Sequence, residues 1–484
     1  MTCRASHAFM ALASWIVLSA CASLPDRPDT DEILTETAQI PTAWTDRTQD
    51  ILARLGSEVP DTVWEGFEDP ALTALVRQSI DATPSAREAQ ARLILARTRV
   101  DLARARLRPT LSLGASATRE RSSLEGPQFA NLPPAFADQA DPELDVFGLS
   151  ASAAWEPDIW GRRALEVEAA RLSAEAAEAR ADATLLSLQS DTARTYVQLR
   201  ATQVRESLTR DALALLEETL QLTTLLREQD LASDLDGAQV RAAIEERGAE
   251  LASLEGQRID LALALATLTG QTPEAAGRLV DGPVAIPGYE TGIPDGVPST
   301  LLARRPDLRA ASAGLMAARA QSDADDLNRL PTFSLTGEGG LISTMLDTLI
   351  STDARRGAIG AALGWPIFQG GALEARRDAS DAEVLIAEAQ YDAAVLRALG
   401  DVEGALSRYV ASERAARRYE TAIAERERIV ALTEMRFRSG LESQFRVIET
   451  QTELLQRRIA RADADAASAI AIIDLFAALG GEWR

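Results

Sequence analysis

The chain contains no lysine, one histidine and only two cysteines among its 484 residues. These three residues, Cys3, His7 and Cys21, all lie within the first 21 positions. The rest of the chain therefore offers no imidazole base, no thiolate nucleophile and no histidine or cysteine ligand for a metal. It can form no disulfide of its own. The formal net charge of −23 would repel nucleic acid, so no nucleic-acid partner is expected.

The first 20 residues predict a secretion signal. Arg4 provides a positive start, an apolar run covers 9–18, and small residues lead to Cys21. This run is too short to cross a bilayer as a helix. Leu18-Ser19-Ala20-Cys21 resembles the lipobox of bacterial lipoproteins, which implies cleavage before Cys21 and acylation of its thiol. Ala22 is not aspartate, which in that family implies the outer membrane. The alternative is an ordinary secretion signal with an incidental cysteine.

Four segments alternate between apolar and small polar residues, at 110–118, 147–155, 332–337 and 359–367. A period of two predicts strands. An apolar face opposite a face of glycine, serine and alanine is expected where lipid lies on one side and water on the other. An amphipathic hairpin on a soluble core is the alternative.

Very long helices are predicted at 160–227, 233–270, 370–438 and 443–480. Ser233 is expected to cap the second of them, with Asp236 completing a capping box. Apolar residues three and four apart form a coiled-coil seam in the last pair. The residues of this seam are Val395, Leu399, Val402, Leu406 and Tyr409 on one helix, and Phe445, Ile448, Thr452, Leu455, Ile459, Ala462, Ala466, Ala469, Ile473 and Phe476 on the other.

The pattern of helix, two strands and helical hairpin occurs twice. Matching residues are 210 positions apart downstream of the strand loops and 222 apart upstream of them. The pairs are Trp155 and Trp365, Ser233 and Ser443, Gly270 and Gly480, then Pro84 and Pro306, and Pro109 and Pro331. The predicted organisation is a signal peptide (1–20), an N-terminal and equatorial segment (21–83), repeat 1 (84–270), an equatorial linker (271–304), repeat 2 (305–480) and a C-terminal end (481–484).

Four strands cannot close into a barrel, and an open edge in lipid leaves backbone groups unpaired. Several copies of the chain must therefore share one barrel. Trp155, Trp160, Trp365 and Phe368 lie where strands give way to helices, so they are predicted to form an interfacial aromatic belt. A role in a packed core is the alternative for these side chains.

Several motifs together resemble the TolC/OprM-type outer-membrane factors, in the lipoprotein (NodT-like) branch associated with multidrug efflux. They are the lipobox, Arg304 to Ala311, Gly364-Trp365-Pro366-Ile367-Phe368, Arg436 to Gly440 with Ser443, and Ala478 to Trp483. The resemblance implies an α+β membrane protein: a trimeric, twelve-stranded transmembrane β-barrel continued by a long periplasmic α-helical barrel. An equatorial girdle would come from the N-terminal segment, residues 271–300 and the C-terminus.

The resemblance also implies passive export without catalysis or a cofactor. The expected partners are two further copies of the chain, a periplasmic adaptor (membrane fusion) protein, an inner-membrane RND-type pump and outer-membrane lipid. The outer component of a type I protein secretion system is an alternative within the family. A lipid-anchored coiled-coil scaffold without a pore is an alternative outside it, and an enzyme using its many carboxylates is a third.

Adaptors of the family contact the hairpin turns, which fall near 227–233 and 436–443, and the tunnel closes at the same end. The implied gate and contact residues are Asp230, Asp234, Asp236, Phe437, Gly440, Ser443, Arg446 and Glu449. Arg446 stands where the family often has an acid, and this deprives Ser443 of a capping-box partner. We expect Arg446 to pair with an acid near Asp230 to Asp236. Solvated turn charges are the alternative for each acid.

Overall fold

The computed structural model describes residues 63–121, 123, 143–229, 232–279, 284–289 and 304–481. The described residues fall into two compact units. The first contains Leu95–Ala174 and Ala313–Glu388, and the second contains the described parts of Thr30–Ile94, Glu175–Ser312 and Ala389–Arg484. The predicted positions Cys21 and Asp230 lie outside the described residues.

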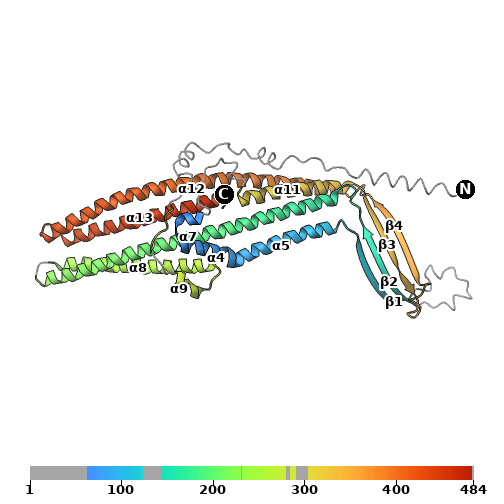
Figure 1. Cartoon of the computed structure of the whole chain (residues 1–484), viewed down its shortest axis with the longest axis horizontal. Coiled ribbons are helices and arrows are strands. Elements are labelled where there is room, and N and C mark those ends of the chain that lie inside the picture. Colours follow the sequence, from blue (N-terminus) through green and yellow to red (C-terminus); the bar gives the residue numbers. More distant parts are fainter. Residues whose placement is uncertain are drawn as a thin grey trace, which may run out of the picture. The chain divides into compact units, whose positions relative to one another are not determined.

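The first unit holds one antiparallel sheet of four strands in the order β1 (Thr110–Arg121), β2 (Glu143–Trp155), β3 (Thr332–Ser343) and β4 (Arg355–Gly364). The strands of the two repeats therefore pair with one another, β2 with β3, as Figure 1 shows. The prediction that the fourth strand reaches residue 367 is wrong. It ends at Gly364, because Pro366 has no N–H to donate to a ladder. It begins earlier than predicted, at Arg355.

Pairing in the sheet keeps the two predicted faces separate across all four strands. Leu113 lies opposite Ala151, and Ala151 opposite Gly339, so odd-numbered residues share one face. The even-numbered residues, among them Ser112 and Ser152, share the other. A slip of one residue at any pairing would mix the two sets.

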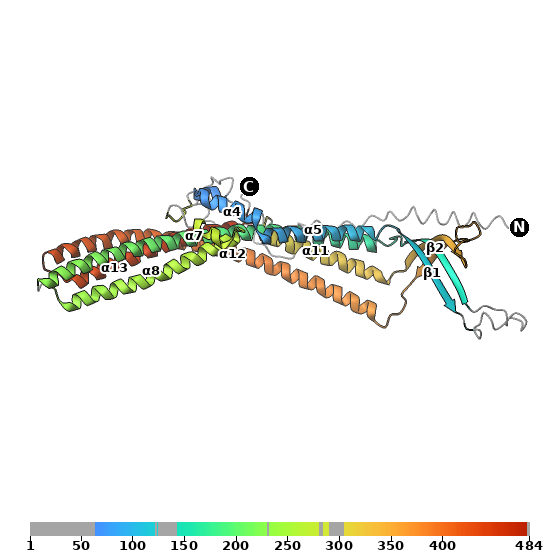
Figure 2. The ribbon, with the colours of Figure 1, turned by 90° about the horizontal axis from the view of Figure 1, so that it is seen from below.

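Two helical hairpins follow the strand pairs. They are α7 (Arg162–Glu228) with α8 (Asp234–Leu268), and α12 (Ala372–Arg438) with α13 (Gln444–Ala478). The long helices have 67 residues each and the returning helices 35 each. All four bounds repeat at 210 positions, as the duplication predicts. The four helices can be followed by their labels in Figure 2. No described helix combines the length and the hydropathy that a membrane-crossing helix needs.

Shorter elements precede each strand pair. η1 (Val63–Phe67), α4 (Pro70–Ala82) and α5 (Pro84–Ala105) lead to β1. α11 (Pro306–Asp326) and η3 (Leu327–Arg329) lead to β3. Between the repeats lie η2 (Pro273–Ala275) and α9 (Ala276–Leu279). α5 and α11 begin 222 residues apart, the predicted upstream offset.

The main hydrophobic core lies in the second unit. There η1 and α4 pack against α7, α12 and the end of α13, in a cluster that includes Leu72, Val197, Leu406 and Ile473. The ring of Trp64 meets that of Phe476 edge to face, with 4.9 Å between centroids. All predicted residues of the seam in the second hairpin are buried or partly buried, except Phe445. Phe445 is 51 % exposed, because the buried side of the first turn of α13 is formed by Gln444, Val447 and Ile448.

A buried arginine holds the start of repeat 2 to its end. The Arg305 guanidinium donates to both carboxylate oxygens of Asp307 (3.0 and 2.8 Å), to Asp401 of α12 (3.0 Å) and to the carbonyl of Ala478, the last residue of α13 (2.9 Å). Burial opposes charge on the Asp307 carboxyl, but the hydrogen bonds from Arg305 hold its pKa below the usual range. Arg305 therefore connects three helices.

Candidate functional site: sheet faces and hairpin turns

The odd-numbered face of the sheet forms an apolar band. On β1 it runs through Leu111 and Leu113, which are 75 % and 81 % exposed, to Ala117. Charges follow at once: Arg119 bonds to Asp145 at 2.6 Å. The eight steps from Leu111 to Arg119 span about 26 Å of strand, or about 20 Å of height after a barrel-like tilt. This is close to the apolar band of about 25 Å on outer-membrane barrels.

Tryptophans mark the other end of this band. The Trp155 indole N–H donates to the Leu107 carbonyl (3.0 Å), just beyond α5, and the Trp365 indole donates to the Arg329 carbonyl (3.2 Å), in η3. The two acceptors are themselves 222 residues apart, so both repeats use the same contact. Each indole satisfies a carbonyl where a helical segment gives way to a strand, while its ring stays exposed.

The other predicted aromatics lie at the same end of the strands. Trp160 is 47 % exposed and donates to the Pro331 carbonyl (2.6 Å). Phe368 is 88 % exposed. In the described chain these four rings are exposed, and each of the three indole N–H groups has an acceptor. Their place in an interfacial belt stays a prediction.

The even-numbered face carries small and polar side chains. Ser112 and Ser152 share a hydrogen bond at 2.7 Å. Two charged residues, Glu338 and Arg356, also lie on this face and bond at 2.6 Å. The sequence analysis missed both, although counting alternate residues along the third and fourth segments would have placed them here.

The second hairpin turns on a glycine. Gly440 has φ +69°, the left-handed region that other residues enter at a cost. Its N–H donates to the Phe437 carbonyl (2.9 Å), and the Leu441 N–H donates to the Arg436 carbonyl (2.9 Å). These two bonds are a Schellman motif, which ends α12.

The same turn starts α13 with half a capping box. The Ser443 hydroxyl accepts from the Arg446 N–H (3.3 Å), as predicted, with no acidic partner three residues on. The predicted pairing of Arg446 with an acid near 230–236 is wrong for the described chain. Arg446 bonds to Glu449, one turn along its own helix, where the short spacing makes that carboxylate the nearest anion.

The first turn keeps the full capping box that the sequence predicts. Asp236 accepts from the Ser233 N–H (2.8 Å), and the Ser233 hydroxyl accepts from the Asp236 N–H (3.2 Å). The hydrogen bonds from Ser233 lower the pKa of the Asp236 carboxyl. Asp234, which is exposed, pairs with Arg227 at 3.2 Å.

The fold brings the two hairpins of one chain together close to these turns. Val240 of α8, which is fully buried, packs with Ile448 of α13 and Leu216 of α7. Farther along, Asp474 accepts from Arg194 of α7 (2.7 Å) and from Arg408 of α12 (2.9 Å). No sequence pattern linked the hairpins in this way.

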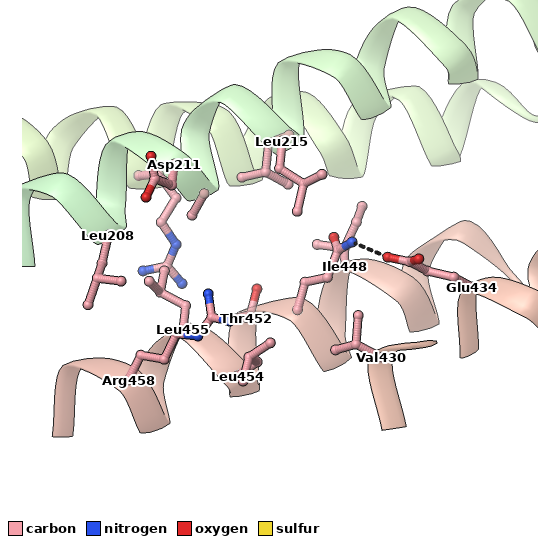
Figure 3. A pocket seen from close by; sticks show the side chains of 14 residues that line it. Leu208, Asp211, Leu215, Val430, Glu434, Ile448, Thr452, Leu454, Leu455 and Arg458 are labelled. Atoms are coloured by element: carbon pink, nitrogen blue, oxygen red, sulfur yellow. Dashed lines mark hydrogen bonds between the residues drawn. The ribbon is translucent and has the colours of Figure 1, made fainter. Parts of the chain in front are cut away.

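A cavity of about 180 Å³ remains between the hairpins above this contact (Figure 3). Leu208, Leu215 and Leu455 line it, with Asp211 and Arg458 among the polar side chains. Leu216 and Ile448 also line it, so the cavity borders the contact at Val240.

These features define a class of protein. A two-faced sheet with an apolar band, and paired helices of 67 residues, are the parts that one chain supplies to an outer-membrane channel with a helical tunnel.

Comparison with known proteins agrees with this class. The family model for outer membrane efflux protein matches residues 75–271 and 297–481, and the chain belongs to this family. The chain is 28 % identical to the pyoverdine export outer membrane protein OpmQ of Pseudomonas aeruginosa, over 98 % of this chain and 96 % of that protein. It is 26 % identical to the multidrug resistance outer membrane protein MdtQ of Escherichia coli O157:H7, over 97 % and 96 %.

Solved structures show the same fold. The outer-membrane channel OprN has a TM-score of 0.83 and 28 % identity, with 92 % of this chain and 97 % of that one covered. VceC of Vibrio cholerae has a TM-score of 0.77 and 26 % identity, with 87 % and 98 % covered. The predicted fold class, with four barrel strands per chain and a long helical barrel from a tandem repeat, is confirmed. The protein is an outer-membrane efflux channel.

Proposed function

We propose that three copies of the chain close one twelve-stranded barrel and form the exit channel of a tripartite system that exports drugs or other small molecules. A periplasmic adaptor and an inner-membrane RND-type pump would deliver the substrate. The observation that carries this proposal is the sheet. Its outer strands, β1 and β4, each have a strand partner on one side only within the described chain. In lipid such edges require partners, and the β4 edge of one copy can pair with the β1 edge of the next.

The names of the relatives support small molecules as cargo, since OpmQ exports pyoverdine and MdtQ belongs to multidrug resistance. Acylated Cys21 would add a lipid anchor to the barrel. The acids and Phe437 at the hairpin turns would form the gate and the adaptor contact. These turns suit such a role because their described residues carry exposed charges, and the helices that leave them meet at Val240 and Ile448.

A first experiment separates a barrel from a lipid anchor. The Cys21→Ala chain is expected to need detergent for extraction, to remain trimeric by light scattering, and to conduct ions in planar bilayers. The barrel band, not the acyl chain, would hold it in the membrane. Release of this variant by a salt or carbonate wash, as a rod without conductance, would refute the channel.

The turn charges provide a second prediction. Arg446→Glu removes the cation that pairs with Glu449 and places two carboxylates one turn apart, repeated in each copy. We expect this repulsion to raise the resting conductance and to increase drug leakage into a reporter strain. Arg438→Glu, which changes the same charge at an exposed position on the other side of the turn, is the matched control. Equal leakage from both variants, or none from Arg446→Glu, would contradict a specific role for Arg446.

A further inference from the structure

The polar face of the sheet carries a cross-strand ion pair in its middle. Glu338 on β3 accepts from Arg356 on β4 at 2.6 Å. The residues beside Glu338 in the same row are Ser152 of β2 and Ala358 of β4. Within β1 to β4 the only other charge on this face is Glu120, which lies one residue from the end of β1. In its own two rows the pair is surrounded by small side chains, and the first large one on this face is Ile342, in the next row.

The side chain opposite Arg356 is also kept small, for a structural reason. Gly340 lies opposite Arg356 on β3, and a Cβ there would come within 2.3 Å of the Leu149 carbonyl oxygen. Backbone packing thus excludes a side chain beside the guanidinium. Gly114 and Ser150 complete this row across the sheet. No large side chain stands between the pair and the space in front of the sheet.

The pair contributes little to stability. Its side chains are 38 % and 48 % exposed, and exposed ion pairs stabilise proteins by about 0–1 kcal/mol. Its charges nevertheless stand on the face that the apolar band assigns to the lumen. Three copies would place three such pairs around one aqueous path, where neighbouring charges act together on a passing ion.

We propose that Glu338 and Arg356 form a charge-compensated ring in the barrel lumen that determines how the exit path discriminates between cationic and anionic solutes. This inference rests on the proposed trimeric channel. While both partners are present, each carboxylate is neutralised by the adjacent guanidinium, and the exit path admits either sign. Loss of one partner exposes three charges of one sign to the lumen.

The test measures the local potential without requiring an open tunnel. Ser152→Cys places a thiol on the lumenal face beside Glu338, and Ala153→Cys places one on the lipid face of the same strand. Full-length protein in lipid vesicles is treated with a cationic or an anionic methanethiosulfonate reagent of similar size. The ratio of the two rates cancels any change in the reactivity of the thiol itself. Protein without an added cysteine provides the blank.

In the Ser152→Cys background, Arg356→Gln is expected to raise the cation-to-anion rate ratio about sevenfold in dilute salt, since one charge about 7 Å away changes each rate by roughly a factor of e, in opposite directions for the two reagents. Glu338→Gln should lower the ratio by a similar factor. Glu338→Gln with Arg356→Gln should restore it. The shifts should largely disappear at 1 M salt, where the screening length is about 3 Å.

A matched control uses the ion pair on the other face. Arg119→Gln leaves Asp145 without its 2.6 Å partner on the lipid side, so the ratio at Ser152→Cys should not change. Labelling at Ser152→Cys but not at Ala153→Cys, with a ratio that none of the Glu338 and Arg356 variants changes, would overturn this inference while leaving the channel intact. Labelling of Ala153→Cys in place of Ser152→Cys would refute the lumen assignment and the proposed function with it.

Discussion

Arg305→Met is expected to lower the free energy of unfolding by about 3 kcal/mol, near the lower end of the range for breaking a buried charged network. The methionine fills much of the volume but donates to none of the acceptors on Asp307, Asp401 and the Ala478 carbonyl. The two carboxylates are half-exposed and can regain water, which limits the loss. The measurement is pulse proteolysis of detergent-solubilised protein across a urea series.

Two further variants make this prediction specific. Arg309→Met removes an arginine four residues along the same helix, whose 3.3 Å pair with Asp182 is exposed on both sides, and it should cost less than about 1 kcal/mol. Arg305→Lys keeps the charge but not the planar fork of the guanidinium, so its loss of unfolding free energy should lie between those of Arg305→Met and Arg309→Met. If Arg305→Met and Arg309→Met lower the free energy of unfolding by the same amount, the three-helix contact does not stabilise the fold.

The second large effect is expected at Gly480, just after the end of α13. Its φ is +95°, and a Cβ at this position would lie 3.0 Å from the carbonyl carbon and oxygen of Arg304. Gly480→Ala must enter an unfavourable backbone region and displace the start of repeat 2. Together these costs amount to about 3 kcal/mol.

Gly400→Ala is the matched control for this substitution. Gly400 lies inside α12, and a Cβ there meets nothing within 4 Å, so alanine should stabilise the helix by about 0.5–1 kcal/mol. Both variants are compared by the midpoint of thermal unfolding in detergent. A midpoint for Gly480→Ala at or above that of the unaltered protein would show that the close approach at Arg304 is relaxed in the folded protein.

Local rules explain most of what the sequence predicted correctly. Strand alternation and the Ser233 capping box depend on residues near one another in the chain, and the offsets of 210 and 222 follow from the repetition of such local patterns. The structure shows all three. The errors lie where a local pattern meets a boundary. Phe445 has the seam spacing but is exposed, because Gln444 and Val447 form the buried side of this turn. Residues 365–367 alternate beyond the point where Pro366 ends the ladder.

Apart from the Ser233 capping box, the pairing of side chains could not be predicted from the sequence. Arg446 was expected to reach another helix, yet Glu449 on its own helix is nearer. The sequence places Arg305 in a family motif, and only the structure shows its contacts with α12 and α13. In repeat 1 the equivalent position is Thr83, which caps α5 by accepting from the Ala86 N–H, so duplication did not predict the role either.

The sequence by itself determined the elements, their order, their two faces and their duplication, because hydrophobic period and capping chemistry are set over a few residues. Only the tertiary structure decided that β2 pairs with β3, that Val240 meets Ile448, and that Glu338 stands beside Arg356 on the polar face. These contacts join residues far apart in the chain or fix a register between strands. Many such pairings satisfy the same local pattern, and the packing of whole elements selects one of them.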